Sequence, residues 1–308
     1  MPIYVLGARN RRVQIPNQAL TVSISGSACD AALVVRGGAD QPVMRPAAQL
    51  AVLPRVTGPV SVGVVPADRG AAFDAGTVVN LAIGHDTADD LDPVQVVFDP
   101  VDVGGDAAVE LATLTPLGAG VEVAAAAVAD HPLSPLASAA RTSARKVVGR
   151  GARAGRGAVL LALDASVSMR PLFADGSAAA AADVVVGVAD AVGVTDVSAV
   201  LVGEDRTPVP AARAGLAGAL AAARPRWCAG ARWSRLTDTG ARTIVCSDFP
   251  TAAVRQRFPV IAVSPDRRLD NHCVRIPPPR PGAQAAAELA AHPAVLDAIT
   301  AALVRVLL

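Results

Sequence analysis

Three oxygen-bearing side chains follow an apolar run near the middle of the chain. Residues 158–163 are apolar without helical spacing, which is typical of a strand buried on both faces. Asp164, Ser166 and Ser168 then occupy alternate positions. Their oxygens can converge on one hard divalent cation, because such cations take oxygen ligands. A Ser-rich turn that caps the next helix explains the same residues, and local chemistry alone does not decide between the two interpretations.

A second carboxylate is predicted to reach the same place. The second half alternates strands and helices, which predicts a mostly parallel sheet covered on both faces. Ligands of such sheets bind beyond the carboxyl ends of the strands. Residues 242–247 predict another core strand, and Asp248 follows it. Asp164 and Asp248 are therefore expected at one edge of the sheet. Helix capping does not explain that coincidence, so the residues favour a metal site built from two strands.

Residues 157–308 resemble the von Willebrand factor type A (vWA) domain family. The match rests on Asp164-x-Ser166-x-Ser168 and on Asp248 at the end of a later core strand. The resemblance implies a Rossmann-like vWA α/β domain with a metal-ion-dependent adhesion site (MIDAS). In that site these residues would hold Mg²⁺ (or Mn²⁺) and leave one position for a carboxylate of a protein partner. The implied function is non-enzymatic protein–protein interaction through an acidic partner residue.

The vWA pattern also includes a threonine on a middle loop. No threonine occurs where that residue is expected, at residues 211–215. Thr207 lies a few residues earlier and is the preferred candidate, whereas Thr237 and Thr239 lie just before the Asp248 strand. If none of them reaches the metal, we expect weaker cation binding or a scaffold with a degenerate site.

An enzyme is the rival hypothesis. A metal-dependent hydrolase would use the same cation to activate water. It would need a general base, and the sequence offers Asp175, Glu204 or Asp205. Neither a phosphate-binding Gly-rich loop nor a Gly-x-Ser-x-Gly nucleophile motif is present. We therefore expect a protein that is not an enzyme.

Residues 1–130 contain eight short β-branched runs separated by turn signals, which predicts a β-sandwich domain. Gly7, Asn10 and Asp30 resemble the start of the tellurium-resistance TerD-like β-sandwich family. That resemblance implies a bacterial stress-response or tellurium-resistance-type system. An acidic stretch in this half either binds Ca²⁺ or keeps a loop solvated. It consists of Asp86, Asp89, Asp90, Asp92, Asp99, Asp102 and Asp106.

The predicted architecture is multidomain, with β followed by α/β. A β-sandwich domain at 1–130 is joined by a helix and an Arg/Gly-rich linker at 131–156 to a vWA-like α/β domain at 157–308. The helix is expected at residues 136–148. The Gly- and Arg-rich residues after it act as a soluble hinge or contact an anionic partner.

Composition narrows the classes of partner. The 28 Lys and Arg against 27 Asp and Glu give a net charge of +1, which provides no global field for nucleic acid. The sequence contains no apolar segment of about 18 residues, so we expect no membrane span. Arg9, Arg11 and Arg12 interrupt any N-terminal signal sequence. Four cysteines without C-x-x-C spacing are expected to be reduced. These features predict a cytoplasmic protein with neither nucleic acid nor membrane as partner.

Overall fold

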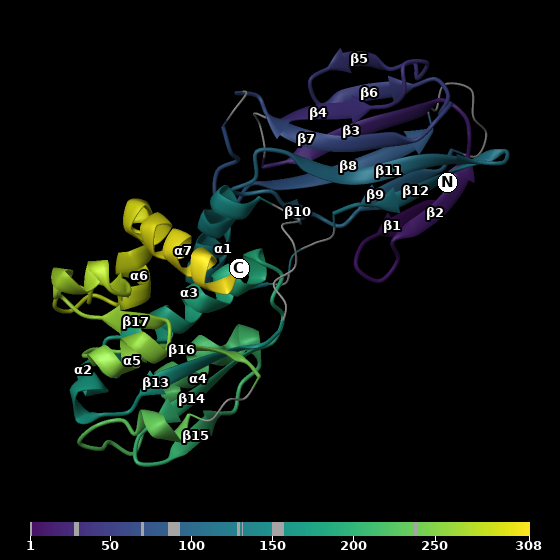
Figure 1. Cartoon of the computed structure of the whole chain (residues 1–308). Helices are drawn as coiled ribbons and strands as arrows, with labels where there is room; N and C mark the ends of the chain where they lie inside the picture. The colour runs from purple at the N-terminus through teal and green to yellow at the C-terminus, as the bar shows by residue number, and fades with distance from the viewer. Residues whose placement is uncertain are drawn as a thin grey trace. The chain divides into compact units, whose positions relative to one another are not determined.

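The computed structural model describes residues 2–27, 31–68, 71–85, 93–127, 130, 132–149, 157–236 and 240–308. The chain forms two compact units, Met1–His131 and Pro132–Leu308. It has mixed α/β content with several sheets, one of them mostly parallel (Figure 1).

In its described part, the first unit consists of strands alone. They are β1 (Ile3–Leu6), β2 (Arg12–Pro16), β3 (Leu20–Gly26), β4 (Ala31–Arg36), β5 (Met44–Ala47), β6 (Leu50–Leu53), β7 (Val60–Pro66), β8 (Val78–His85), β9 (Gln95–Phe98), β10 (Val101–Asp102), β11 (Val109–Leu117) and β12 (Gly120–Ala125). A seven-stranded sheet has the order β1-β9-β8-β3-β6-β5 with β10 paired to β8, and a five-stranded sheet has the order β2-β12-β11-β7-β4. The sequence predicted eight of these strands and missed β2, β5, β6 and β10.

Alternation of burial explains the core of the first unit. In β7, Val60, Val62 and Val64 are buried while the residues between them are half-buried. This period of two is typical of strands with one face turned to a core. Inward side chains of both sheets, such as Leu20 from β3 and Leu114 from β11, belong to one hydrophobic cluster.

The second unit is built on a six-stranded sheet. Its strands are β13 (Val159–Asp164), β14 (Val197–Val202), β15 (Arg206–Val209), β16 (Arg242–Ser247), β17 (Val260–Val263) and β18 (Val274–Ile276). Their order is β15-β14-β13-β16-β17-β18, and only the edge strand β15 is antiparallel. Strand order therefore reverses between β13 and β16. Ligands of open α/β sheets bind at such a switch point, beyond the carboxyl ends of the strands.

Helices cover both faces of this sheet (Figure 1). They are α1 (Pro135–Val148), α2 (Arg170–Ala174), α3 (Ser177–Ala191), α4 (Leu216–Ala222), α5 (Ala252–Arg257), α6 (Ala285–Ala290) and α7 (Pro293–Leu307), with 3₁₀ helices η1 (Val167–Met169), η2 (Arg213–Gly215), η3 (Trp233–Arg235) and η4 (Arg267–Asn271). Residues 211–223 are rich in Ala and Leu, which predicts one helix, but the structure divides this segment into η2 and α4. Of the described helices, none alone is long and apolar enough to cross a membrane. One bent pair, Val167–Ala174 with Ser177–Ala191, passes on length and composition.

Helix α1 belongs to the second unit, although the sequence analysis placed it in a segment between domains. Ser134 caps it by accepting a hydrogen bond from the Ala137 amide at 3.1 Å. Its buried residues join the same hydrophobic cluster as α3 and α7. Asp190 of α3 pairs with Arg141 at 3.4 Å and with Arg213 at 2.8 Å. These apolar and ionic contacts fix α1 on α3. Of the Arg/Gly-rich linker, residues 150–156 lie outside the described residues.

Candidate cation site

Asp164 is the last residue of β13, at the switch point of the sheet. Its side chain is only 6% exposed. One carboxylate oxygen, Oδ1, accepts from the Ser166 amide at 2.8 Å, and Oδ2 accepts from the Ser247 hydroxyl at 2.7 Å. Ser247 ends β16, so neighbouring strands on either side of the switch point fix this carboxylate.

The Asp164 carboxylate has only neutral partners. Within the described part of the chain, no Lys, Arg or His nitrogen lies within 4.0 Å of it. Burial of a charge is costly unless a counter-ion compensates it. A bound cation would therefore compensate the charge of this buried carboxylate.

Ser166 and Ser168 supply two hydroxyls beside Asp164. Their Oγ atoms are 3.0 Å apart. Neighbouring ligands of an octahedral Mg²⁺ with bonds of about 2.0–2.1 Å lie about 2.9 Å apart, so this pair fits two adjacent positions. Ser166 precedes η1, yet its side chain makes no capping hydrogen bond to that helix. The helix-cap interpretation of Ser166 is therefore not what the structure shows.

Backbone hydrogen bonds hold the serine turn in place. Ser166 forms a parallel bridge with Cys228. The Val167 amide donates to the Cys228 carbonyl at 2.9 Å, and the Cys228 amide donates to the Ala165 carbonyl at 3.2 Å. A second segment, at Cys228, thus holds residues 165–167 of the turn that carries the hydroxyls.

Asp248 lies at the same edge, immediately after β16. The parallel register aligns Leu163 of β13 with Cys246 of β16. Asp164 follows Leu163 by one residue, and Asp248 follows Cys246 by two. Burial, and then the nearby carboxylates Asp164 and Asp248, raise the pKa of the Cys246 thiol to about 12. That thiol stays protonated at neutral pH and offers no thiolate ligand. The candidate ligands Asp164, Ser166, Ser168 and Asp248 supply oxygens, which suit a hard cation such as Mg²⁺.

Carboxylates alone do not make this site. Among the described residues, no group of three or more His, Cys, Asp or Glu side chains could hold a metal ion. A cation bound at Asp164 must therefore take the serine hydroxyls and water as further ligands. This donor set, two carboxylates with two hydroxyls, fits Mg²⁺ because that ion keeps several waters in protein sites.

The structure places Thr207 apart from Asp164. Thr207 is exposed on β15 and pairs with Leu201 of β14, which in turn pairs with Leu163 of β13. Neighbouring strands lie about 4.8 Å apart, so two strand spacings, about 10 Å, separate Thr207 from β13. Its register with Leu163 also puts its side chain on the sheet face opposite to that of Asp164. The alternatives Thr237 and Thr239 lie outside the described residues.

The three candidate general bases lie on other parts of the same edge. Asp175 is engaged at the start of α3, where its Oδ1 accepts from the Ser177 amide at 2.9 Å. Glu204 and Asp205 are exposed in the turn between β14 and β15. Neither of these two carboxylates makes a hydrogen bond or ion pair to another described side chain.

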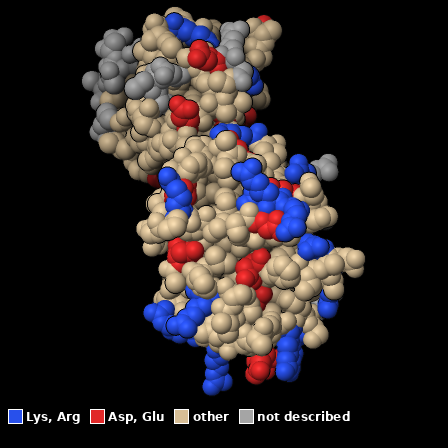
Figure 2. Space-filling view, turned by 90° about the vertical axis from the view of Figure 1, so that its left-hand side faces the viewer, with Lys and Arg blue, Asp and Glu red and all other residues tan. Residues whose placement is uncertain are grey.

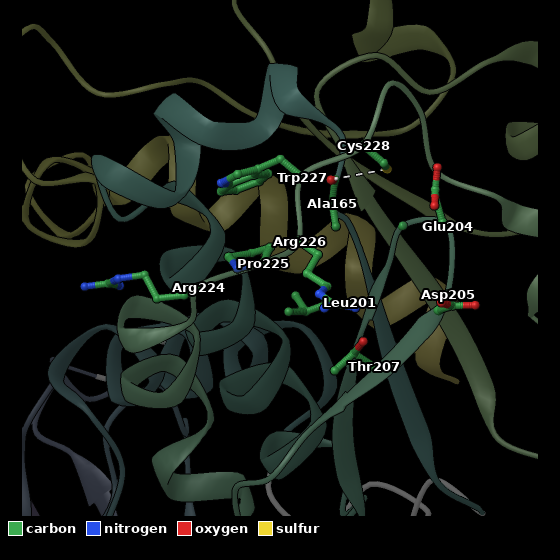
Figure 3. Close-up of a pocket in the computed structure, with 11 residues that line it drawn as sticks. Ala165, Leu201, Glu204, Asp205, Thr207, Arg224, Pro225, Arg226, Trp227 and Cys228 are labelled. Atoms are coloured by element: carbon green, nitrogen blue, oxygen red, sulfur yellow. Dashed lines mark hydrogen bonds between the residues drawn. The ribbon is translucent and has the colours of Figure 1, made fainter.

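Ser247 and a cavity beside the serine turn were not predicted from the sequence. The register of β13 with β16 places Ser247 level with Asp164, so aligning the ends of the two predicted strands would have found it. The cavity, of about 240 Å³, is lined by Ala165, Thr207, Glu204, Asp205 and the segment 224–228. Figure 3 shows the Arg226 side chain extending toward Leu201 and Thr207, whereas Trp227 turns away. Trp227 instead packs edge-to-face on Phe173, with ring centroids 5.4 Å apart.

Two exposed apolar side chains adjoin the candidate ligands. Val167 lies between the two serines and is 55% exposed, and Phe249 follows Asp248 and is 82% exposed. Exposed large apolar groups beside polar ones are typical of interaction surfaces.

The expected calcium site in the first unit falls largely on residues without a description. Asp86, Asp89, Asp90 and Asp92 lie outside the described residues, as does Asp30 of the TerD-like pattern. Of the others, Asp102 accepts from the Gly104 amide at 2.9 Å and Asp106 is buried. Gly7 and Asn10 close the turn between β1 and β2, where the Gly7 amide donates to the Asn10 carbonyl at 2.8 Å. Calcium binding in this unit stays a prediction.

Comparison of the chain with protein-family models, with curated proteins and with solved structures found no match.

Proposed function

We propose that this chain is a non-enzymatic protein-interaction protein that binds Mg²⁺ (or Mn²⁺) at Asp164 and docks an acidic residue of a protein partner. The observation that carries the proposal is the buried Asp164 carboxylate. It has no protein counter-ion in the described part of the chain, and both its oxygens are held by neutral donors. A divalent cation would supply the missing positive charge.

The residues at this edge would have separate roles in binding the cation. The Ser166 and Ser168 hydroxyls would bind the cation, while Asp164 and Asp248 would balance its charge directly or through water. When bound, Mg²⁺ keeps water-filled positions, and a carboxylate from a partner can replace one of those waters. Val167 and Phe249 would add apolar contact with the same partner.

The proposal includes a vWA-like arrangement of the second unit and a β-sandwich in the first. The strand order with an antiparallel edge strand and the Asp-x-Ser-x-Ser sequence after β13 support the vWA-like part. Two sheets that share one hydrophobic cluster support the β-sandwich. The TerD-like resemblance of Gly7 and Asn10 places the protein, in this proposal, in a bacterial stress-response or tellurium-resistance-type system.

A metal-dependent hydrolase is the second candidate. Glu204 and Asp205 favour it, because they line the cavity that also contains Ala165, the neighbour of Asp164. Either carboxylate would act as the general base toward a water activated by the cation.

Isothermal titration of Mg²⁺ or Mn²⁺ tests the proposal. Asp196 offers a matched control, because it is an exposed carboxylate just before β14, at the opposite edge of the sheet. We expect equal binding heats for the natural chain and Asp196→Ala, and no binding heat for Asp164→Ala. Equal heats in all three proteins would remove the cation site from Asp164. Metal-dependent turnover of generic phosphoesters would favour the hydrolase, and no heat in the natural chain would leave a scaffold with a degenerate site.

A further inference from the structure

The net charge of +1 conceals a division of charge between the two units. Residues 1–131 contain 7 Lys and Arg against 14 Asp and Glu, whereas residues 132–308 contain 21 against 13. The first unit therefore carries −7 and the second +8. No Lys or Arg occurs between Arg69 and Arg141, where 11 acidic residues are found. The net charge of the whole chain predicts no strong field, but the net charges of the two units are large and opposite in sign.

Four exposed arginines of the second unit lie beside the serine turn or on the segment that supports it, at an edge that also carries the exposed Glu204 and Asp205. Arg170 follows the serine turn directly, and Arg226, Arg232 and Arg235 lie on the segment that supports it. The Arg232 amide donates to the carbonyl of Gly203, at the end of β14, at 3.0 Å. All four side chains are exposed, and in the described part of the chain none lies within 4.0 Å of a carboxylate. Figure 2 shows several groups of Lys and Arg on this unit.

The first unit presents acidic side chains of the same kind. Asp68 and Asp74 lie between β7 and β8, and Glu110 is near the start of β11, which pairs with β7. All three are exposed, and none forms an ion pair with a described Lys or Arg. Carboxylates here are free to meet a basic surface on another molecule.

We infer that the acidic partner is a second copy of this chain. The acidic first unit of one molecule docks on the basic, cation-binding edge of the second unit of another, head to tail. The binding of a carboxylate to the cation rests on the proposed function. The pairing of the two charged surfaces does not depend on it. Copies with a net charge near zero do not repel one another, and complementary surfaces accelerate and orient their encounter. Such an interface is heterologous, so it extends into chains or closes into rings.

Sedimentation velocity of the full chain in Mg²⁺ tests this inference. Two triple variants reverse one surface each: Asp68→Lys, Asp74→Lys and Glu110→Lys in the first unit, and Arg226→Glu, Arg232→Glu and Arg235→Glu in the second. We expect the mass of the natural chain to rise with concentration at about 10 mM salt and to fall to the monomer at about 1 M. Across that range the Debye length shrinks from about 30 Å to about 3 Å.

The mixture of the two variants decides the geometry. Each variant alone should be monomeric, and an equimolar mixture should associate with the two variants in equal numbers, because the natural acidic surface of one variant meets the natural basic surface of the other. A natural chain that stays monomeric at low salt, or a mixture that stays monomeric, would overturn the inference. A monomeric chain that instead binds a DNA duplex in low salt would overturn it in favour of nucleic acid.

Titration of Mg²⁺ into the first-unit variant separates this inference from the proposed function. If this variant gives the same Mg²⁺ binding heats as the natural chain, and the natural chain does not associate, the cation site is supported and self-association is refuted. Salt-sensitive association without Mg²⁺ heats would support the charge pairing and refute the cation site.

Discussion

Gly187 tests whether α1 is an integral part of the second unit. A Cβ at this position of α3 would lie 2.2 Å from the Ala137 carbonyl oxygen and 2.8 Å from the Ala140 Cβ of α1. The obstacle is helix backbone, which cannot rotate away, so Gly187→Ala must push α1 and α3 apart. Overpacking a core costs about 1–3 kcal/mol, and the better helix propensity of Ala returns up to about 1 kcal/mol. We therefore expect the free energy of unfolding to fall by about 1–2 kcal/mol.

Tryptophan fluorescence during urea unfolding measures this change in the right unit. Both tryptophans of the chain, Trp227 and Trp233, lie in the second unit. Gly218→Ala in α4 is the matched control, because its Cβ would meet nothing within 4 Å. That change should raise the free energy of unfolding by about 0.5–1 kcal/mol. If Gly187→Ala were as stable as the natural chain or more so, the close packing of α1 on α3 would be refuted.

Three further changes probe buried charges of the second unit. Asp190→Ala removes the carboxylate that pairs with both Arg141 and Arg213 and should lower the free energy of unfolding by about 3 kcal/mol; a loss under about 1 kcal/mol would contradict the pairing. Burial raises the pKa of Asp183, so its ionised form weakens the folded state at neutral pH. Asp183→Asn should accordingly stabilise the protein at pH 7 but not at pH 3, and equal effects at both would refute this. The pKa of Cys246 rises from an ordinary 9.0 to about 12, so the thiol's contribution to stability is complete below pH 9 and is lost toward pH 12. Cys246→Ala should flatten the alkaline fall in unfolding free energy, and an unchanged slope would count against it.

The sequence predicted β13, β14, β15, β16 and β17 of the second unit, four of them from apolar runs, and missed the three-residue strand β18. Pro208 and Pro210 beside Thr207 are typical of an edge strand, and β15 is the edge strand of this sheet. Periodicity missed β5, because its four residues are all exposed and do not alternate between buried and exposed positions. The helix α1 was predicted, but not its place. Ala137, Ala140 and Gly187 allow a close approach of two helices that only the tertiary structure reveals.

The candidate site was predictable as far as strand ends determine it. Asp164 and Asp248 follow neighbouring parallel strands, so sequence alone could bring them to one edge. The role of Ser247 depends on register, and the support of Ser166 by Cys228 depends on a loop contact between residues far apart in sequence. Aligning the two predicted strand ends would have found Ser247, whereas the contact with Cys228 has no pattern in the sequence. Thr207 was selected by the vWA pattern, and the register places it two strands from Asp164.

Anomalous diffraction from crystals of the full chain grown with Mn²⁺ tests the cation site most directly. We expect one anomalous peak at the end of β13, within coordination distance of the Ser166 and Ser168 hydroxyls and beside Asp164, and no such peak in Asp164→Ala crystals. A natural chain whose Mn²⁺ lies elsewhere, or whose Asp164 edge holds no anomalous peak at saturating Mn²⁺, would contradict it.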